Sequence, residues 1–73
     1  MEKEEIKQRF GKSMREFRIS NGVTKAELSR RTGFSVRAIE YWESGERKVK
    51  LENFIQTLLA LGYDVDISVK EKE

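Results

Sequence analysis

The sequence predicts a compact, mainly α-helical domain of four helices, followed by one C-terminal β-strand. Large apolar residues recur every three or four positions before residue 20 and again over residues 51–61, which is the period of a helix with one buried face. Between these segments, residues 23–45 read as two short helices joined by a tight turn. Residues 63–70 alternate apolar and polar side chains, which is the period of a strand.

The first helix is predicted over residues 1–20. Asn21 and Gly22 follow the last periodic residue and are expected to end it, because this pair favours a turn. The apolar stripe steps by four, four and three positions and is interpreted as core: Ile6, Phe10, Met14 and Phe17.

The two short helices in the middle of the chain carry clear start and stop signals. Thr24 is a good N-cap for the first of them, and Glu27, three residues later, completes a capping-box pattern. Gly33 supplies a residue that tolerates positive φ at the turn. Ser35 is a second N-cap, for a helix over residues 36–43. Two short helices joined by a three- to four-residue turn have the geometry of a DNA-binding helix-turn-helix.

The fourth helix is predicted over residues 51–61. Lys50 is a poor N-cap for it, and Gly62 is a good C-terminal stop. Val49 is expected to anchor the preceding loop to the core. The buried stripe is predicted to consist of Leu51, Phe54, Ile55, Leu58 and Leu61.

Taken in order, the residues of the two short central helices and of the turn between them resemble the helix-turn-helix of the Xre/Cro-repressor family, the phage-repressor-like bacterial regulators. Thr32 departs from the family pattern, which usually has an aliphatic residue there, and so does Lys25, where glutamine is frequent. The resemblance runs from residue 10 to residue 62. The matching elements are Thr24-Lys25-Ala26-Glu27-Leu28, Gly33, Ser35, Ile39 and Trp42-Glu43-Ser44-Gly45.

The resemblance implies a DNA-binding domain over residues 1–62 whose second motif helix enters the major groove. The outward face of that helix has groups that suit base edges, and the expected base contacts are Ser35, Val36, Arg37 and Tyr41. Arg37 suits a guanine and Val36 a thymine methyl, although a phosphate contact is nearly as well supported for Arg37. Glu40 is expected either to orient Arg37 or to repel phosphate. The expected phosphate contacts are Lys25, Arg47, Lys48 and Lys50.

The resemblance also implies an internal clamp between the first helix and the recognition helix. Arg18 matches the family arginine at the end of the first helix, and Glu43 matches its glutamate partner. The planar guanidinium fits a carboxylate through two parallel hydrogen bonds. The alternative is that the two residues are unrelated surface charges.

Charge and composition narrow the function classes. The net charge is +2, but residues 1–50 hold 13 of the 15 Lys and Arg with 8 of the 13 Asp and Glu, a local +5, which leaves −3 for residues 51–73. A basic front suits a polyanionic partner. Cysteine and histidine are both absent, so no metal, cofactor or enzymatic activity is expected. A charged N-terminus and the lack of a long apolar run predict a cytoplasmic protein that does not enter a membrane.

Residues 63–73 are predicted to be a strand and tail that mediate dimerisation. The apolar face of the strand would carry Tyr63, Val65, Ile67 and Val69. A single strand cannot satisfy its own backbone groups, and no other segment of the chain is a strand candidate. The expected partner is therefore the same strand of a second copy, an arrangement that resembles antitoxin members of the family. A disordered tail is the alternative.

The sequence thus predicts a DNA-binding transcriptional regulator, a repressor acting as a homodimer on a palindromic operator of double-stranded DNA. The first alternative is an antitoxin that binds a toxin protein and regulates its own operon. The second is a protein-interaction module that has lost DNA binding.

Overall fold

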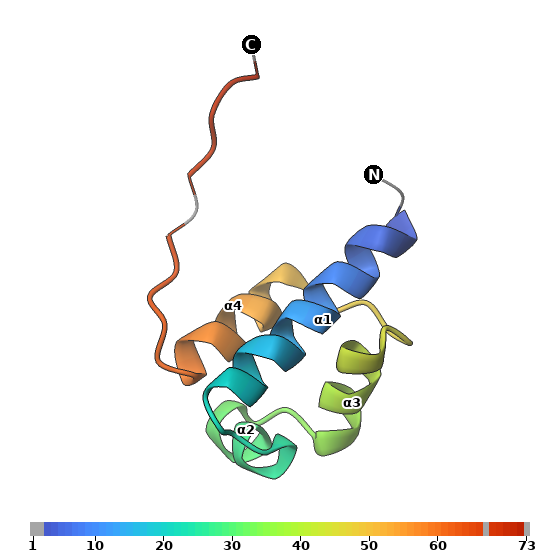
Figure 1. Cartoon of the computed structure of the whole chain (residues 1–73), viewed down its shortest axis with the longest axis vertical. Helices are drawn as coiled ribbons and strands as arrows, with labels where there is room; N and C mark the ends of the chain where they lie inside the picture. Colours follow the sequence, from blue (N-terminus) through green and yellow to red (C-terminus); the bar gives the residue numbers. More distant parts are fainter. Residues whose placement is uncertain (1–2, 67, 73) are drawn as a thin grey trace.

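The computed structural model describes the backbone of residues 3–66 and 68–72, and the side chains from residue 9 onward. Within this part of the chain, four helices form a compact body from which the C-terminal tail projects (Figure 1). They are α1 (Lys3–Ser20), α2 (Lys25–Thr32), α3 (Val36–Ser44) and α4 (Leu51–Ala60). The predicted mainly α-helical class and the order of the four helices are confirmed.

The predicted signals at the helix ends are present in the structure. The hydroxyl of Thr24 accepts a hydrogen bond of 3.1 Å from the backbone N–H of Glu27, and the hydroxyl of Ser35 accepts one of 3.0 Å from Ala38. Gly33 ends α2 with a φ of +84°, which a residue with a Cβ would adopt only with strain. Each N-cap bond satisfies one orphan amide at a helix start and is worth about 1 kcal/mol.

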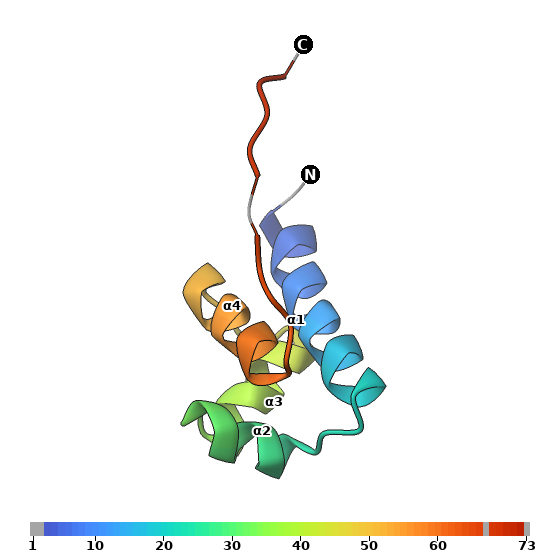
Figure 2. The same ribbon diagram turned by 90° about the vertical axis from the view of Figure 1, so that its left-hand side faces the viewer.

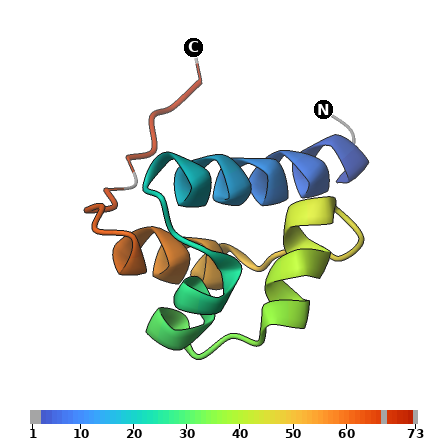
Figure 3. The same cartoon turned by 60° about the horizontal axis from the view of Figure 1, so that its bottom comes forward.

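The core lies where the motif helices meet α1 and α4. Leu28 of α2 and Ile39 of α3 are fully buried at its centre, and the largely buried Val23 and Leu61 pack beside them. Figure 3 shows α1 (blue) along the top of the helical body, with α2 (green), α3 (yellow-green) and α4 (orange) beneath it. Partly buried side chains pack around this centre: Phe17, Phe34 and Ala60. The motif is thus held by its own apolar residues and by the helices on either side of it.

Helix α1 also crosses α3 at very short range, a contact made possible by Gly11. A Cβ built on Gly11 would lie 1.8 Å from the backbone carbonyl oxygen of Trp42, far inside van der Waals contact. Next to it on α1, Met14 is fully buried. The crossing therefore requires glycine at position 11, a residue that the sequence analysis did not single out.

The loop between α3 and α4 and the fourth helix bear out most of their predictions, with one correction. Val49 is buried and anchors the loop, and Lys50 makes no capping bond with its side chain. Leu51, predicted to be core, is 56% exposed. It is the first residue of α4, and because helical side chains tilt toward the N-terminus, it leans past the helix end. Thr57 is fully buried instead, and its hydroxyl donates to the Asn53 carbonyl at 2.9 Å.

The strand predicted after Gly62 is wrong for the residues that the structure describes. Residues 63–66 and 68–72 form no strand, and they leave α4 as an extended segment that points away from the helices (Figure 2). Ile67 lies outside the described residues. The physical reason is that a strand needs a neighbour to satisfy its backbone groups, and the described part of this chain offers none.

Tyr63 begins the tail and contacts its own chain. Its ring packs edge-on against Phe17 of α1, with the ring centroids 5.1 Å apart, and its hydroxyl accepts a 2.9 Å hydrogen bond from the Asn21 side chain. Val65 is half-buried, whereas Val69 is 90% exposed. Of the predicted interface residues that the structure describes, Val69 is thus the most exposed, whereas Tyr63 contacts α1 of its own chain.

Candidate nucleic-acid interface

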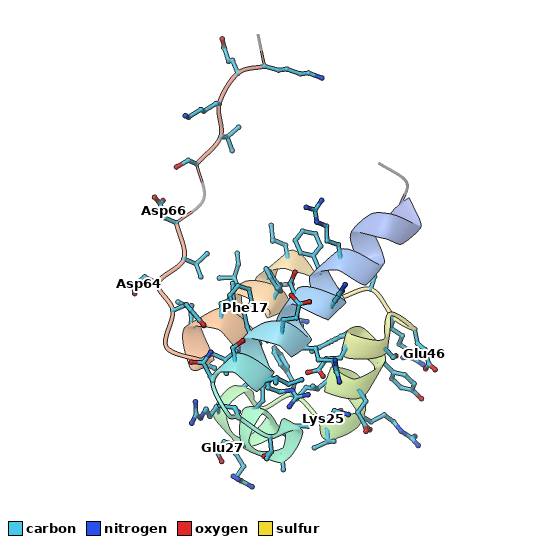
Figure 4. The ribbon with its side chains drawn as sticks, viewed as in Figure 1. Phe17, Lys25, Glu27, Glu46, Asp64 and Asp66 are labelled. Carbon is cyan, nitrogen blue, oxygen red and sulfur yellow. The ribbon has the colours of Figure 1, made fainter. Side chains whose placement is uncertain are left out.

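The outward face of α3 is the centre of the candidate interface. Ser35 caps the helix, and Val36 and Arg37 follow in its first turn, all three with exposed side chains. Figure 4 shows side chains on the outer side of α3 projecting away from the other three helices. The N-terminal end of a helix also carries free amide donors and a partial positive charge. This end of α3 is therefore open to a ligand with negative charge and hydrogen-bonding edges.

A shallow pocket of about 270 Å³ lies on this face, between α3 and the loop that follows it. It brings together three of the four expected base-contacting residues with one expected phosphate contact. Val36 is exposed beside the pocket but does not line it. The lining residues are Ser35, Arg37, Ala38, Tyr41, Trp42 and Arg47.

The loop after α3 folds back onto that helix. Gly45 ends α3 with a φ of +82°, and the backbone N–H of Arg47 then donates to the Tyr41 carbonyl at 3.2 Å. The guanidinium carbon of Arg47 lies 4.6 Å from the centroid of the Tyr41 ring. Lys48 and Lys50 are exposed on either side of the buried Val49. The loop thus presents three cations next to the outward face of α3.

Lys25, an expected phosphate contact, lies against α3 and is labelled in Figure 4. Its Nζ is 3.5 Å from a carboxylate oxygen of Glu40, and the two side chains are 39% and 54% exposed. Glu40 therefore pairs with Lys25, where the sequence analysis expected it to act on Arg37 or on phosphate. A pair this exposed is weak, so Lys25 remains available to an anion.

Arg18 and Glu43 form a two-bond contact that ties α1 to α3. Arg18 Nε donates to Glu43 Oε2 and Arg18 Nη2 to Glu43 Oε1, both at 2.8 Å. The third donor, Nη1, bonds the Val23 carbonyl at 2.9 Å. The hydrogen bond to Glu43 raises the pKa of Arg18 above its ordinary value, against the opposing effect of burial. The pair therefore holds α3, the helix that carries Arg37, against α1.

The two arginines of α2 are occupied within the chain. Glu27, at the lower edge of the molecule in Figure 4, accepts hydrogen bonds from Arg30 and from Arg31. These bonds, led by the one from Arg30, lower the pKa of the Glu27 carboxyl. Arg31 also donates to the Ala60 carbonyl at 3.3 Å. These contacts support α2 and its junction with α4.

Two features of the interface escaped the sequence analysis. The Lys25–Glu40 pair joins two helices, and nothing in the spacing of the residues pointed to it. The contact between Tyr41 and Arg47 crosses the end of α3. The signal that would have found it is Gly45, because a left-handed glycine after a helix returns the chain toward the last turn.

The comparison with known families agrees with this geometry. The family model described as Helix-turn-helix matches residues 14–67, which include the whole motif and α4. No curated protein and no solved structure matches the chain. Among the described residues, no helix is both long enough and apolar enough to cross a membrane.

Proposed function

Because the chain belongs to the Xre-like helix-turn-helix family of DNA-binding transcriptional regulators, we propose that it is a repressor that binds a palindromic operator as a homodimer. The observation that carries this proposal is the exposed N-terminal end of α3, flanked by a basic loop. A helix end of this kind fits the major groove, where each base pair presents a distinct set of donors and acceptors.

Base reading is assigned to the first turn of α3. Arg37 can donate two parallel hydrogen bonds to the O6 and N7 atoms of guanine. Val36 offers an apolar surface to a thymine methyl group, and Ser35 offers a hydroxyl. All three side chains are exposed on one end of the helix, so they can approach neighbouring base pairs together.

Phosphate binding is assigned to the cations around this end. Lys25 approaches from α2, and the loop after α3 contributes Arg47, Lys48 and Lys50. Phosphate contacts carry no sequence information themselves, but they fix the position of the reading helix on the duplex. The local excess of positive charge in residues 1–50 supports this assignment.

Two copies are proposed because one short recognition helix spans only a few base pairs. A two-fold pair of helices about 34–36 Å apart reads two half-sites one turn of DNA apart. The projecting tail is the candidate contact between the copies, since Val69 leaves a large apolar side chain in water. Repression requires only that the dimer occupy its operator.

The second candidate function is that of an antitoxin, favoured by the same tail. The tail points away from the helices (Figures 1 and 2), so a toxin bound to it would leave α3 free for the operator. Co-purification of the product of a neighbouring gene with the full chain, but not with a chain ending at Gly62, would support this function. Failure to retain that product on either chain would oppose it.

Selection of bound duplexes from a random pool tests the proposed function. We expect the pool to converge on a short inverted repeat with half-sites about one helical turn apart. Enrichment of a single unrepeated half-site would contradict binding as a homodimer but would still support a DNA-binding regulator. A pool that stays random, with no salt-dependent binding, would point to an interaction module that does not bind DNA.

A further inference from the structure

The side chains of Tyr41 and Arg47 are in direct contact beside the proposed base-reading residues. The aromatic face of Tyr41 carries the guanidinium of Arg47, whose carbon lies 4.6 Å from the ring centroid. A cation over an aromatic face is attracted by the negative charge of the ring face. Tyr41 is half-buried while Arg47 is exposed. The packed ring of Tyr41 therefore supports the solvent-facing side chain of Arg47.

Hydrogen bonds of the loop bring the backbone of Arg47 close to Tyr41. Its N–H donates to the Tyr41 carbonyl at 3.2 Å, and the Ser44 hydroxyl donates to the same carbonyl at 3.1 Å. The Glu46 N–H in turn donates to the Ser44 hydroxyl at 3.3 Å. Residues 45–47 are thus folded against the last turn of α3, which fixes the position from which the Arg47 side chain extends.

The pocket places Tyr41 and Arg47 next to the proposed base-reading residues. Arg47 and Tyr41 line one depression together with Arg37 and Ser35, the proposed base-reading residues. An anion bound by Arg47 is therefore close to the base edges that Arg37 would reach. The chemistry of the pocket, with two guanidinium groups, a hydroxyl and an aromatic wall, suits a phosphodiester of the duplex backbone.

We propose that Tyr41 is a positioning residue, which holds Arg47 over its ring so that Arg47 binds one DNA phosphate and sets the register of Arg37 on the bases. This inference rests on the proposed function and deepens it. It moves Tyr41 from the expected base-contacting set to a role exerted through Arg47. The ring of Tyr41 is what matters in this role, and its hydroxyl is dispensable.

A double-mutant cycle on DNA binding tests the proposal. Tyr41→Phe should bind the selected duplex as the natural chain does, because the ring face remains. Tyr41→Leu should weaken binding of the selected duplex about two- to fivefold, the worth of an exposed cation–π contact, and should weaken random duplexes less, because Arg37 also loses its register on the bases. In the background of Arg47→Ala, Tyr41→Leu should cost nothing further. Thermal unfolding of each variant checks that the fold is retained.

Lys48 provides the matched control, because it is an exposed cation of the same loop. The effects of Tyr41→Leu and Lys48→Ala should add, since the ring supports Arg47 alone. If Tyr41→Leu unfolds the domain, Tyr41→Gln replaces it: the aromatic face is lost while Arg47 is unchanged, and binding should fall by the same two- to fivefold factor.

Several outcomes would overturn the inference while leaving the proposed function intact. Loss of base discrimination in Tyr41→Phe would show that the hydroxyl reads a base. Additive effects of Tyr41→Leu and Arg47→Ala on selected-duplex binding would show that the two residues act separately. Unchanged binding by a folded variant that lacks the ring, Tyr41→Leu or Tyr41→Gln, would show that the ring does not position Arg47. Failure of the natural chain to bind any duplex would instead remove both the function and this inference.

Discussion

Arg18 donates two hydrogen bonds of 2.8 Å to the Glu43 carboxylate, although the two residues are 25 positions apart in the chain. Their side chains are only 9% and 3% exposed, so the pair joins α1 to α3 away from water. The remaining bond, to the Val23 carbonyl, fixes the segment that leads into α2. The pair therefore sets where the recognition helix lies relative to the rest of the domain.

Breaking this pair should be costly. Arg18→Met leaves the buried Glu43 carboxylate without its partner, and we expect it to lower the free energy of unfolding by about 3–5 kcal/mol. Denaturant unfolding of Arg18→Met, Glu43→Gln and the double variant measures the coupling between the two residues. The coupling should lie well above the ~0.2–1 kcal/mol that is typical of exposed pairs.

The exposed pair of Lys25 and Glu40 is the matched control, because it also joins a neighbouring helix to α3. Its cycle should give a coupling within the range of exposed pairs. Equal couplings for the two pairs would contradict the account of Arg18 and Glu43 as a buried clamp.

Gly11→Ala should destabilise the domain, against the usual trend for helices. Alanine normally stabilises a helix interior relative to glycine by ~0.5–1 kcal/mol. Here the added Cβ would meet the Trp42 carbonyl at 1.8 Å, and overpacking of this kind costs about 1–3 kcal/mol or more. Thermal unfolding of the variant and of the natural chain shows whether the substitution lowers or raises stability.

Gly22→Ala is the control for this change, because it adds the same methyl group where no atom lies within 4 Å. Its φ of +66° should still cost about 1–2 kcal/mol. A Gly11→Ala variant more stable than the natural chain would show that α1 and α3 do not approach as closely as described.

Glu27 should make a pH-dependent contribution to stability. Its pKa in the folded chain is lowered, mainly by the hydrogen bond from Arg30, so the contribution is fully present above the ordinary value near 4.5 and is lost as the pH falls through the lowered pKa. The difference in unfolding free energy between the natural chain and Glu27→Gln should be constant near neutral pH and shrink in acid.

A variant that carries Arg30→Gln and Arg31→Gln is the control for this pH dependence. In that background the acid-dependent part of the Glu27→Gln effect should be largely gone, because its two hydrogen-bond donors are removed. Urea unfolding between neutral pH and pH 3 measures both series. A Glu27→Gln effect that stays constant down to pH 3 would contradict the ion pairing.

Removal of the tail should weaken dimerisation. A chain ending at Gly62 loses the exposed Val69 but keeps all four helices, and sedimentation should show it as more monomeric than the full chain. A chain ending at Asp64 keeps the contact of Tyr63 with Phe17. It therefore tests whether dimerisation needs the rest of the tail when this contact is intact. If both shortened chains dimerise as the full chain does, the tail is not the dimer element.

Local signals explain how much of the fold was predictable. The two N-caps, the left-handed Gly33 and the periodic apolar residues each act within a few positions, and Thr24 and Ser35 cap their helices as expected. Residues that depend on distant partners were harder to predict. Gly11 matters only because α3 crosses α1 at that point, and a lone glycine in a helical pattern does not reveal what crosses it.

The errors at the C-terminal end have a similar cause. Leu51 fits the apolar period of α4, but periodicity does not tell which end of a helix extends past the core. The alternation of residues 63–70 satisfies the period of a strand, whereas strand formation depends on a neighbour that the sequence of one chain does not contain. In the candidate interface, exposure of α3 followed from the motif, but the support of Arg47 by Tyr41 required the path of the loop.

The central claim, that the first turn of α3 reads bases while the loop cations hold phosphates, is tested most directly by comparing Arg37→Ala with Lys48→Ala on selected and random duplexes. Arg37→Ala should cost about 1–3 kcal/mol on the selected duplex, relax preference at one base position, and change random-duplex binding much less. Lys48→Ala should weaken both duplexes alike and reduce the slope of log affinity against log salt by about 0.9. Equal losses on both duplexes for Arg37→Ala would contradict the claim, because Arg37 would then contact only the DNA backbone.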